Sequence, residues 1–229
     1  MKKTSNKNIW QKYWQQKDHQ PMVIHEEMLR QITNYHPPAG GSITNKKILE
    51  VGAGMGGDSI YLAKKGADVT VLDFSREALE QVKENAEKEG ILFNYVEADA
   101  LDMPFKNDSF DIIFHQGFLE HFNNPEDYLK EQYRVLKKGG SLIVDVPQKY
   151  TAYTIKKHFA MRQNKWFVGW ETEYSPRELR SIMEKCGFSV VNMYGWGYYG
   201  KIKILEKIID RLPCKLWLNW CVGCVARKL

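Results

Sequence analysis

The sequence lacks any apolar stretch near the ~20 residues that a membrane-spanning helix requires, so we expect no transmembrane segment. It begins Met-Lys-Lys-Thr-Ser-Asn-Lys-Asn, and because no apolar segment follows these basic residues we expect no secretory signal. Repeats and low-complexity tracts are also absent, which excludes collagen-like and disordered chains. These absences predict a cytoplasmic globular protein, and 229 residues suffice for one domain with an inserted cap.

Cysteine is scarce, and its placement argues against the metal and redox sites that it often forms. A zinc site would need a second Cys pair or a His pair beside Cys221 and Cys224, and neither follows. A thioredoxin-like pair would stand at a helix N-terminus after an early strand. We therefore expect reduced thiols packed in or beside a final strand. The four cysteines are Cys186, Cys214, Cys221 and Cys224.

Dense basic runs are missing too, although the formal net charge is +5. Residues 1–150 hold 19 basic and 22 acidic side chains, so the remainder, 151–229, carries a net charge of +8. A nucleic-acid-binding module would concentrate its charge and interleave aromatic residues, so we expect no nucleic-acid partner. The basic part is interpreted as a solvated surface or, alternatively, as one facing an anionic or membrane-proximal partner.

What the sequence does contain is a regular alternation of short apolar runs and helical patterns. This alternation predicts an α/β fold, a doubly wound parallel sheet with right-handed crossovers and helices on both faces. The rhythm is interrupted by many aromatic residues without a clean period, which predicts an inserted cap over the ligand edge. The expected single domain comprises N-terminal helices in 1–45, a core at 46–147, the aromatic cap at 148–174, and a C-terminal part at 175–229 with a helical elaboration.

Individual elements are predicted from capping and breaking residues. Ser75 and Ser175 precede helical patterns as N-caps, and Pro176 occupies the first helical position. Gly66, Gly90 and Gly187 follow helical patterns where a left-handed residue is needed. The expected strands are 48–51, 68–72, 93–96, 110–114, 141–146, 188–191 and about 220–226, and the other expected helices are 6–17, 21–35, 125–137 and 200–212.

A glycine-rich turn connects the first expected strand to the first core helix, with the sequence Glu-Val-Gly-Ala-Gly-Met-Gly-Gly over 50–57. In an open α/β sheet, ligands bind beyond the carboxyl ends of the strands, and glycines let the backbone approach them closely. Asp73 ends the second strand, where a carboxylate can accept both hydroxyls of a ribose. Together these features predict a cofactor that contains adenosine.

The identity of this cofactor depends on Glu50. The glycine spacing also fits the dinucleotide fingerprint, so NAD is the alternative. A pyrophosphate would lie over the helix N-terminus, and a nearby carboxylate would oppose its negative charge. The sulfonium and ammonium groups of S-adenosylmethionine would instead be attracted by Glu50, which favours that cofactor.

At this point the sequence resembles the class I S-adenosylmethionine-dependent methyltransferases, well over residues 46–147 and loosely over 175–227. ILEVGAGMGGDS is similar to the first motif of that family and VLDFS to its acidic motif. EADALDMPF, DSFDIIFHQGFLEHF and LKEQYRVLKKGGSLIVDVP are similar to the later motifs, in the same order. The resemblance implies a Rossmann-like, seven-stranded sheet with an antiparallel last strand, and an enzyme that produces S-adenosylhomocysteine.

The resemblance also implies which residues bind the cofactor. Asp73 would hold the ribose, Phe74 would lie against the adenine, and Asp99 with Ala100 would meet the adenine edge. Asp99 has an alternative role as a helix or turn cap. The methionine end and the site beneath the reacting methyl would be formed by Glu50, Gly52, Ala53, Gly54, Gly56, His115, Gln116 and Gly117.

Two histidines are candidates for a general base, which methyl transfer requires only when the acceptor must lose a proton. His121 is the first choice and His115 the second. Alternatively, His115 acts through its backbone alone, and the His121 side chain only packs against its neighbours or caps a helix. Glu120 and His121 resemble part of the metal site of ubiquinone-pathway O-methyltransferases, but Gly117 replaces its first glutamate, so we expect no metal.

The acceptor is the least determined part of this interpretation. An aromatic cap favours a small aromatic or apolar acceptor, although its rings could form a core of their own. A basic amphipathic pattern at 201–217 suggests peripheral membrane contact and therefore a quinone or lipid methyltransferase. A third hypothesis is a catalytically silent fold that holds the cofactor as a sensor or scaffold.

Overall fold

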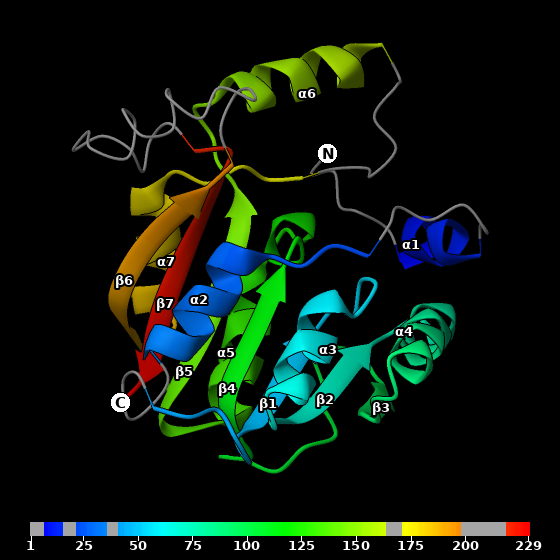
Figure 1. Ribbon diagram of the computed structural model, residues 1–229. Helices are drawn as coiled ribbons and strands as arrows, with labels where there is room; N and C mark the ends of the chain where they lie inside the picture. The colour runs from blue at the N-terminus through cyan, green and yellow to red at the C-terminus, as the bar shows by residue number, and fades with distance from the viewer. Residues whose placement is uncertain (1–6, 16–21, 36–40, 164–170, 198–218) are drawn as a thin grey trace, which may run out of the picture.

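Seven strands form one sheet in the computed structural model, which describes residues 7–15, 22–35, 41–163, 171–197 and 219–229 (Figure 1). The strands are β1 (Lys47–Val51), β2 (Asp68–Asp73), β3 (Asn94–Glu97), β4 (Phe110–Gln116), β5 (Leu136–Pro147), β6 (Phe188–Trp196) and β7 (Cys221–Lys228). Their spatial order is β3-β2-β1-β4-β5-β7-β6. Neighbours among β1 to β5 are parallel, whereas β7 is antiparallel to β5 and β6. The expected Rossmann-like sheet is therefore confirmed.

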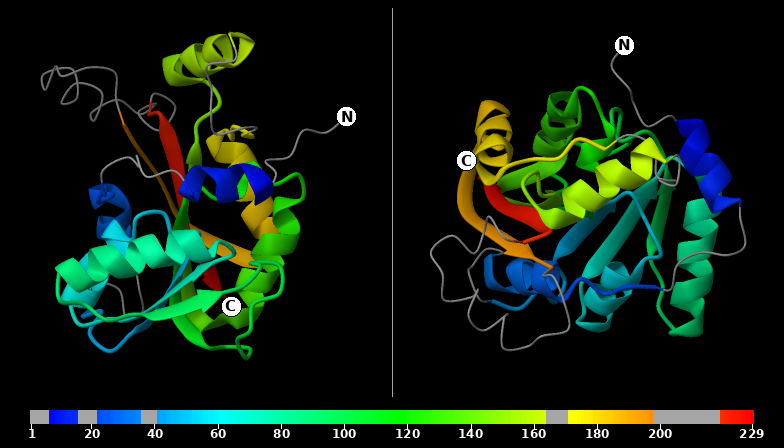
Figure 2. Two further views of the ribbon diagram at one scale, coloured as in Figure 1. Left: turned by 90° about the vertical axis from the view of Figure 1, so that its right-hand side faces the viewer. Right: turned by 90° about the horizontal axis from the view of Figure 1, so that it is seen from above.

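Helices cover both faces of this sheet (Figure 2). They are α1 (Lys7–Trp14), α2 (Glu26–Tyr35), α3 (Gly57–Lys64), α4 (Arg76–Lys88), α5 (Pro125–Val135), α6 (Ala152–Arg162) and α7 (Pro176–Lys185), with the 3-10 turn η1 (Leu119–His121). Side chains of α2, α3 and α4 enter one buried cluster, and those of α5 and α7 enter the other. Along β1, Ile48 and Leu49 belong to opposite clusters because successive strand residues face opposite sides.

The predicted caps are present. The Ser75 hydroxyl accepts a hydrogen bond from the Ala78 N–H at 3.3 Å. Ser175 and Glu178 form a reciprocal capping box, in which each side chain accepts from the other residue's backbone N–H. Gly187 follows α7 with φ +92°, a left-handed conformation that side chains other than glycine's disfavour.

Two predicted helix boundaries are wrong. The helix expected over 21–35 begins at Glu26, because His25 is tied to Asp58 of α3 through its backbone N–H at 2.7 Å. The helix expected over 125–137 ends at Val135, because Leu136 already pairs with Phe110 in the sheet. In both places a tertiary contact overrides the local helical pattern.

The expected cap contains a helix that its aromatic pattern concealed. α6 starts after Thr151, whose hydroxyl accepts from the Thr154 N–H at 3.2 Å. Tyr174 donates its N–H to the Pro147 carbonyl at 3.0 Å, so the two ends of the inserted segment lie side by side. Figures 1 and 2 show α6 above the carboxyl ends of the parallel strands.

The thiols that the structure describes are unpaired, as predicted. Cys221 and Cys224 lie in β7 and Cys186 lies at the end of α7. Burial raises the pKa of Cys224 to about 12, so it remains a protonated, unreactive thiol. Cys214, the helix expected at 200–212 and the membrane contact expected at 201–217 lie outside the described residues. Within the described ranges, no helix combines the length and apolar character needed to cross a bilayer.

Candidate active site

A pocket opens at the carboxyl ends of β1, β2 and β4. This is the edge at which open α/β sheets bind ligands. Its wall combines glycine-loop backbone, three acidic or amide side chains and many aromatic rings. The lining residues are Trp10, Trp14, Gly52, Gly54, Leu72, Asp73, Phe74, Ala98, Asp99, Ala100, Gln116, Gly117, Phe118, His121, Phe122 and Tyr128.

The glycine loop presents bare backbone to this pocket. Gly54 has φ +50°, and a Cβ atom built on it would meet nothing within 4 Å, so the space above it is open. Gly57 is required for a different reason, because a Cβ there would lie 2.2 Å from the Val23 carbonyl oxygen. One glycine thus leaves room for a ligand and the other lets the segment before α2 pack on α3.

Asp73 fixes the loop from the neighbouring strand. Its Oδ2 accepts the Ala53 N–H at 2.9 Å, and its Oδ1 accepts the Ser75 N–H at 2.8 Å. Burial raises the pKa of the Asp73 carboxyl, while the bonds from Ser75 and Ala53 oppose the rise. Asp73 and Phe74 both line the pocket, and their expected contacts with a ribose and an adenine stay predictions.

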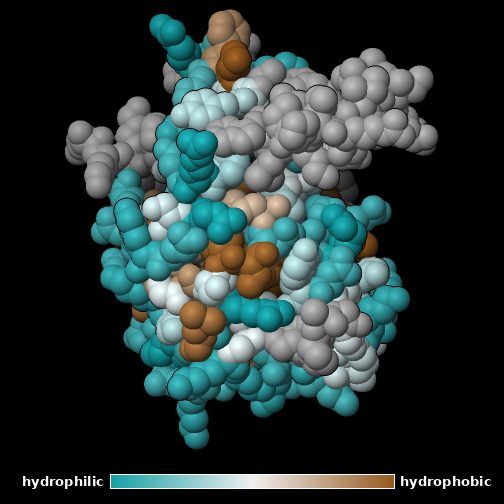
Figure 3. Space-filling model, turned by 90° about the vertical axis from the view of Figure 1, so that its left-hand side faces the viewer, coloured by the Kyte–Doolittle hydropathy of each residue, from teal (hydrophilic) through white to brown (hydrophobic). Residues whose placement is uncertain are grey.

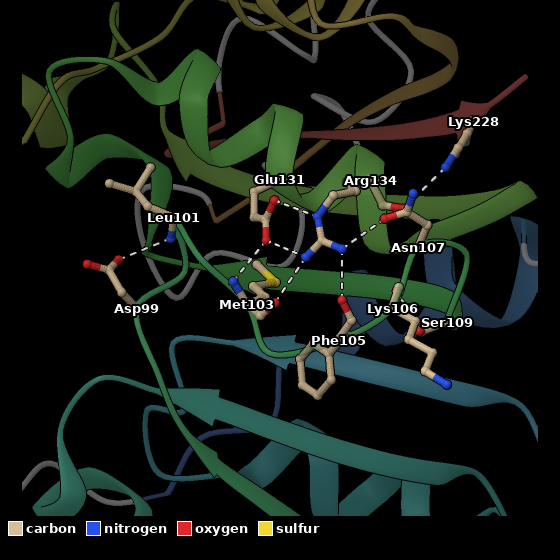
Figure 4. Close-up of polar contacts among 10 residues, drawn as sticks. All are labelled: Asp99, Leu101, Met103, Phe105, Lys106, Asn107, Ser109, Glu131, Arg134 and Lys228. Atoms are coloured by element: carbon tan, nitrogen blue, oxygen red, sulfur yellow. Dashed lines mark hydrogen bonds and ion pairs between the residues drawn. The ribbon is translucent and has the colours of Figure 1, made fainter.

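Asp99 and Ala100 lie in a loop that a separate network holds in place (Figure 4). Asp99 accepts the Leu101 N–H at 3.0 Å, which is the turn-capping role considered as its alternative. Arg134 donates to the Met103 and Phe105 carbonyls at 3.0 and 2.7 Å, and Glu131 accepts the Met103 N–H at 2.8 Å. The loop therefore has a defined shape, and Asp99 both caps it and lines the pocket.

His115 does not reach the pocket. Its side chain is fully buried, behind the Phe118 ring, with ring centroids 5.2 Å apart. Burial lowers the pKa of His115 to about 3, and nearby Gln132 opposes this only in part. The ring is therefore neutral at physiological pH. The next two residues, Gln116 and Gly117, do line the pocket.

Glu50 also lies away from the pocket wall, below the glycine loop. Its carboxyl accepts a hydrogen bond from the Ser59 hydroxyl of α3. Burial, followed by the charge of Asp58, raises the pKa of Glu50 well above its ordinary value. Burial therefore opposes the negative charge of Glu50 on which the electrostatic argument against NAD depends. Ala53 and Gly56 are likewise absent from the lining, and Gly56 lies against Val82.

His121 stands at the aromatic end of the pocket. It belongs to η1, is 5% exposed, and its ring packs edge-on against Trp10 with centroids 4.8 Å apart. The sequence did not predict the rest of this aromatic wall as part of the site. Trp10 and Trp14 fall within the helix expected over 6–17, and no local signal marked these or the other rings as part of a site. The wall consists of Trp10, Trp14, Phe118, Phe122 and Tyr128.

A buried ion cluster, also not predicted, lies next to η1. Lys157 of α6 is 1% exposed and pairs with Glu171 at 3.0 Å and with Glu173. Glu120 faces this cluster, and burial together with the charge of Glu171 raises its pKa to about 8. Nothing in the spacing of these residues revealed that a lysine of the cap would be buried among carboxyls.

Across the ranges that the structure describes, no group of three His, Cys, Asp or Glu side chains is placed to hold a metal ion. Glu120 and His121 are adjacent in η1, and Gly117 contributes no side chain to them.

The fold and the pocket together define an α/β domain with a ligand pocket at the switch point of its sheet. Residues 49–144 match a family model described as a methyltransferase domain. This match agrees with the resemblance that the sequence motifs carry, and it spans the glycine loop, Asp73 and the end of β4.

Curated relatives support the same class. The 2-methyl-6-phytyl-1,4-hydroquinone methyltransferase 1, chloroplastic, of Oryza sativa subsp. japonica is 35% identical over 151 residues, 64% of this chain and 42% of its own length. The fatty-acid O-methyltransferase of Mycolicibacterium smegmatis is 27% identical and covers 87% of this chain and 68% of its own length. The chain thus spans about two fifths of the length of the hydroquinone methyltransferase.

A solved structure shows the same fold. Magnesium protoporphyrin IX methyltransferase from Synechocystis PCC 6803, solved with bound S-adenosylhomocysteine, superimposes with a TM-score of 0.67. The match covers 97% of this chain and 93% of that chain at 14% identity. At this identity the likeness concerns the fold alone.

Replacing Asp73 with asparagine should weaken binding of S-adenosylhomocysteine about 10- to 100-fold, because charge-assisted bonds to backbone N–H groups contribute roughly 1.5 to 3 kcal/mol. The amide can accept only one of the two bonds that order the loop. Calorimetric titration measures the change. Asp68→Asn, at the exposed start of the same strand, should bind within about twofold of the unmodified protein. Equal affinities for both variants would contradict this role of Asp73.

Proposed function

We propose that residues 1–229 act as one methyltransferase domain that transfers a methyl group to a small acceptor of aromatic or apolar character. The observation that carries this proposal is the aromatic wall around His121, adjacent to Gln116 and Gly117 at the end of β4. Rings of this kind favour an apolar acceptor, and a single histidine among them offers a proton acceptor.

The residues present fit the cofactor. Bare backbone at Gly54 and the carboxyl of Asp73 offer contacts to its polar ends, and Phe74 offers a flat surface to its adenine. We assign contacts with S-adenosylmethionine to Gly52, Gly54, Asp73, Phe74, Asp99, Ala100, Gln116 and Gly117. Glu50, Ala53, Gly56 and His115 support the loop and strand from behind rather than line the pocket.

When bound, S-adenosylmethionine supplies a methyl group on a positively charged sulfur. The chain's contribution is mainly to align the acceptor with that group, since an in-line displacement depends on proximity and orientation. For an acceptor hydroxyl, His121 would take the proton that the oxygen loses as it is methylated. The aromatic wall excludes water from the reacting atoms.

A quinone or lipid acceptor is the second candidate. The names of two relatives, the hydroquinone methyltransferase and the fatty-acid O-methyltransferase, favour it, and so does that of the ubiquinone biosynthesis O-methyltransferase, mitochondrial, of Rattus norvegicus. That rat protein is 29% identical over 76% of this chain and 53% of its own length. A cofactor-binding scaffold without turnover is the alternative of another class.

An acceptor assay separates these possibilities. The purified protein is incubated with S-adenosylmethionine and with a hydroquinone, a catechol, a fatty acid or a small aliphatic amine, and S-adenosylhomocysteine release is followed. We expect turnover with a phenolic or fatty-acid acceptor and none with the amine. Turnover with the amine alone would contradict the apolar acceptor, and cofactor binding without turnover on any acceptor would favour the scaffold.

The proposal includes a cytoplasmic location, supported by the unpaired thiols of Cys186, Cys221 and Cys224. Alkylation of the freshly extracted protein, followed by mass spectrometry, tests it. Disulfides among these cysteines would contradict a reducing compartment.

A further inference from the structure

Helix α6 distributes its polar and apolar side chains in the reverse of the way an ordinary surface helix does. Its inner side buries polar residues, Thr154 at 8% and Lys157 at 1% exposure. Its outer side carries Ile155 and Phe159, four residues apart, at 73% and 64% exposure. A helix that packs on a protein core places these two classes the other way round. The outer side of α6 is therefore built for a contact outside the domain.

The buried side of α6 explains why this orientation is fixed. Lys157 forms ion pairs with Glu171 and Glu173, and Thr154 donates its hydroxyl to the Gln148 carbonyl at 2.5 Å. Turning the helix to bury Ile155 would break these bonds and leave Lys157 unpaired. The polar anchor thus keeps the apolar side chains pointed away from the sheet.

A third large exposed side chain extends the same end of the molecule. Tyr150, just before α6, is 64% exposed. Figure 1 places α6 at the top of the molecule, and Figure 3 shows hydrophobic atoms projecting at that end. Neighbouring large apolar side chains at this exposure usually mark an interaction surface.

Charge identifies the kind of partner. Residues 148–163 contain Lys149, Lys156, Lys157 and Arg162 but no aspartate or glutamate. Lys149 pairs with Glu178 at 2.6 Å and Lys157 is buried, whereas Lys156 and Arg162 lie at the exposed surface of α6. Apolar side chains flanked by exposed cations match the boundary between acyl chains and anionic headgroups.

We propose that the outer side of α6 docks the protein on an anionic lipid surface, with Ile155 and Phe159 entering the interfacial layer. Lys156 and Arg162 would lie at the headgroup level, since long basic side chains extend toward the polar region. A second copy of the chain fits this surface poorly, because face-to-face contact would bring the cations of both helices together. The inference goes beyond the proposed function, and it holds whether or not an acceptor is methylated.

Vesicle co-sedimentation tests this surface without any methyl acceptor. The full chain is mixed with vesicles of equal phosphatidylcholine and phosphatidylglycerol, or of phosphatidylcholine alone. The test variant is Ile155→Ser/Phe159→Ser. The matched control is Leu92→Ser, since Leu92 is 90% exposed and lies in the distant turn between α4 and β3. Titration with S-adenosylhomocysteine establishes that each variant is folded.

We expect the unmodified protein and Leu92→Ser to sediment with the anionic vesicles, and less with neutral ones. The double variant should partition at least tenfold less. Raising the salt from about 0.1 to about 0.5 M should also release the protein, because it shortens the Debye length.

Several results would overturn the proposal. One is a failure of the unmodified protein to bind anionic vesicles, and another is equal binding by the double variant. A dimer that sedimentation velocity detects and the double variant dissolves would assign the surface to a second copy instead.

Discussion

Replacing Lys157 with alanine should lower the free energy of unfolding by about 3 to 5 kcal/mol, the usual effect of removing one partner of a buried ion pair. The ammonium is enclosed and compensates Glu171 and Glu173. Without it, the buried Glu171 and the partly buried Glu173 lose their cation beside Glu120, whose pKa burial already raises to about 8. Urea unfolding monitored by circular dichroism gives the difference.

The neighbouring lysine provides the control. Lys156→Ala removes the same charge one residue earlier, where the side chain is exposed, and should change the stability by less than about 0.5 kcal/mol. Equal effects of the two substitutions would show that net charge, and not the buried cluster, is responsible.

The loss of stability in Lys157→Ala should also depend on pH. Burial already raises the pKa of Glu171 in the folded protein, and Lys157 opposes this rise, whereas the pKa of Glu173 is lowered with the help of Lys157. Without the ammonium, both pKa values should rise. A carboxyl whose pKa is raised on folding costs stability as the pH rises, so the deficit should be larger near pH 8 than near pH 5. A deficit that is constant over this range would contradict the electrostatic explanation.

Replacing His121 with alanine should lower kcat by about 100-fold or more while S-adenosylhomocysteine binding changes by less than about threefold, the range expected for removing a general base. The ring lines the aromatic end of the pocket, where we propose that the acceptor binds, and it is held by its edge contact with Trp10. The measurement is S-adenosylhomocysteine release with a hydroxyl acceptor identified in the acceptor assay.

A base and a packing residue can be distinguished by chemical rescue. Added imidazole should restore part of the turnover of His121→Ala if the lost group accepts a proton, because the cavity left by the ring admits a free imidazole. His158→Ala, a 58% exposed side chain on α6, should retain normal kcat. Weaker cofactor binding in His121→Ala, or no effect of imidazole, would assign the residue a structural role.

Much of the fold could be predicted because its signals are local. The N-caps at Ser75 and Ser175 and the left-handed glycines stand within a few residues of the helices they limit. The glycine loop and Asp73 were found because strand ends of a parallel sheet meet at one edge. The motifs, taken in their order along the chain, also named Asp99, Gln116 and Gly117, and the structure places all three in the lining of the pocket.

The remainder depended on contacts between distant segments. The start of α2 is set by His25 binding Asp58, 33 residues away, and the burial of Lys157 depends on a chain segment that returns beside it. The aromatic wall joins Trp10 and Trp14 to rings more than 100 positions later. The direction of the His115 side chain could not be predicted either, since either face of a central strand is buried.

The most direct test of the central claim is a calorimetric titration of the purified protein with S-adenosylhomocysteine, with NAD as the control ligand. We predict micromolar affinity for S-adenosylhomocysteine, about −8 kcal/mol, and no heat with NAD. This result would assign the pocket formed by the glycine loop and Asp73 to the methyl-donor cofactor. Absence of S-adenosylhomocysteine binding, or a preference for NAD, would contradict the account.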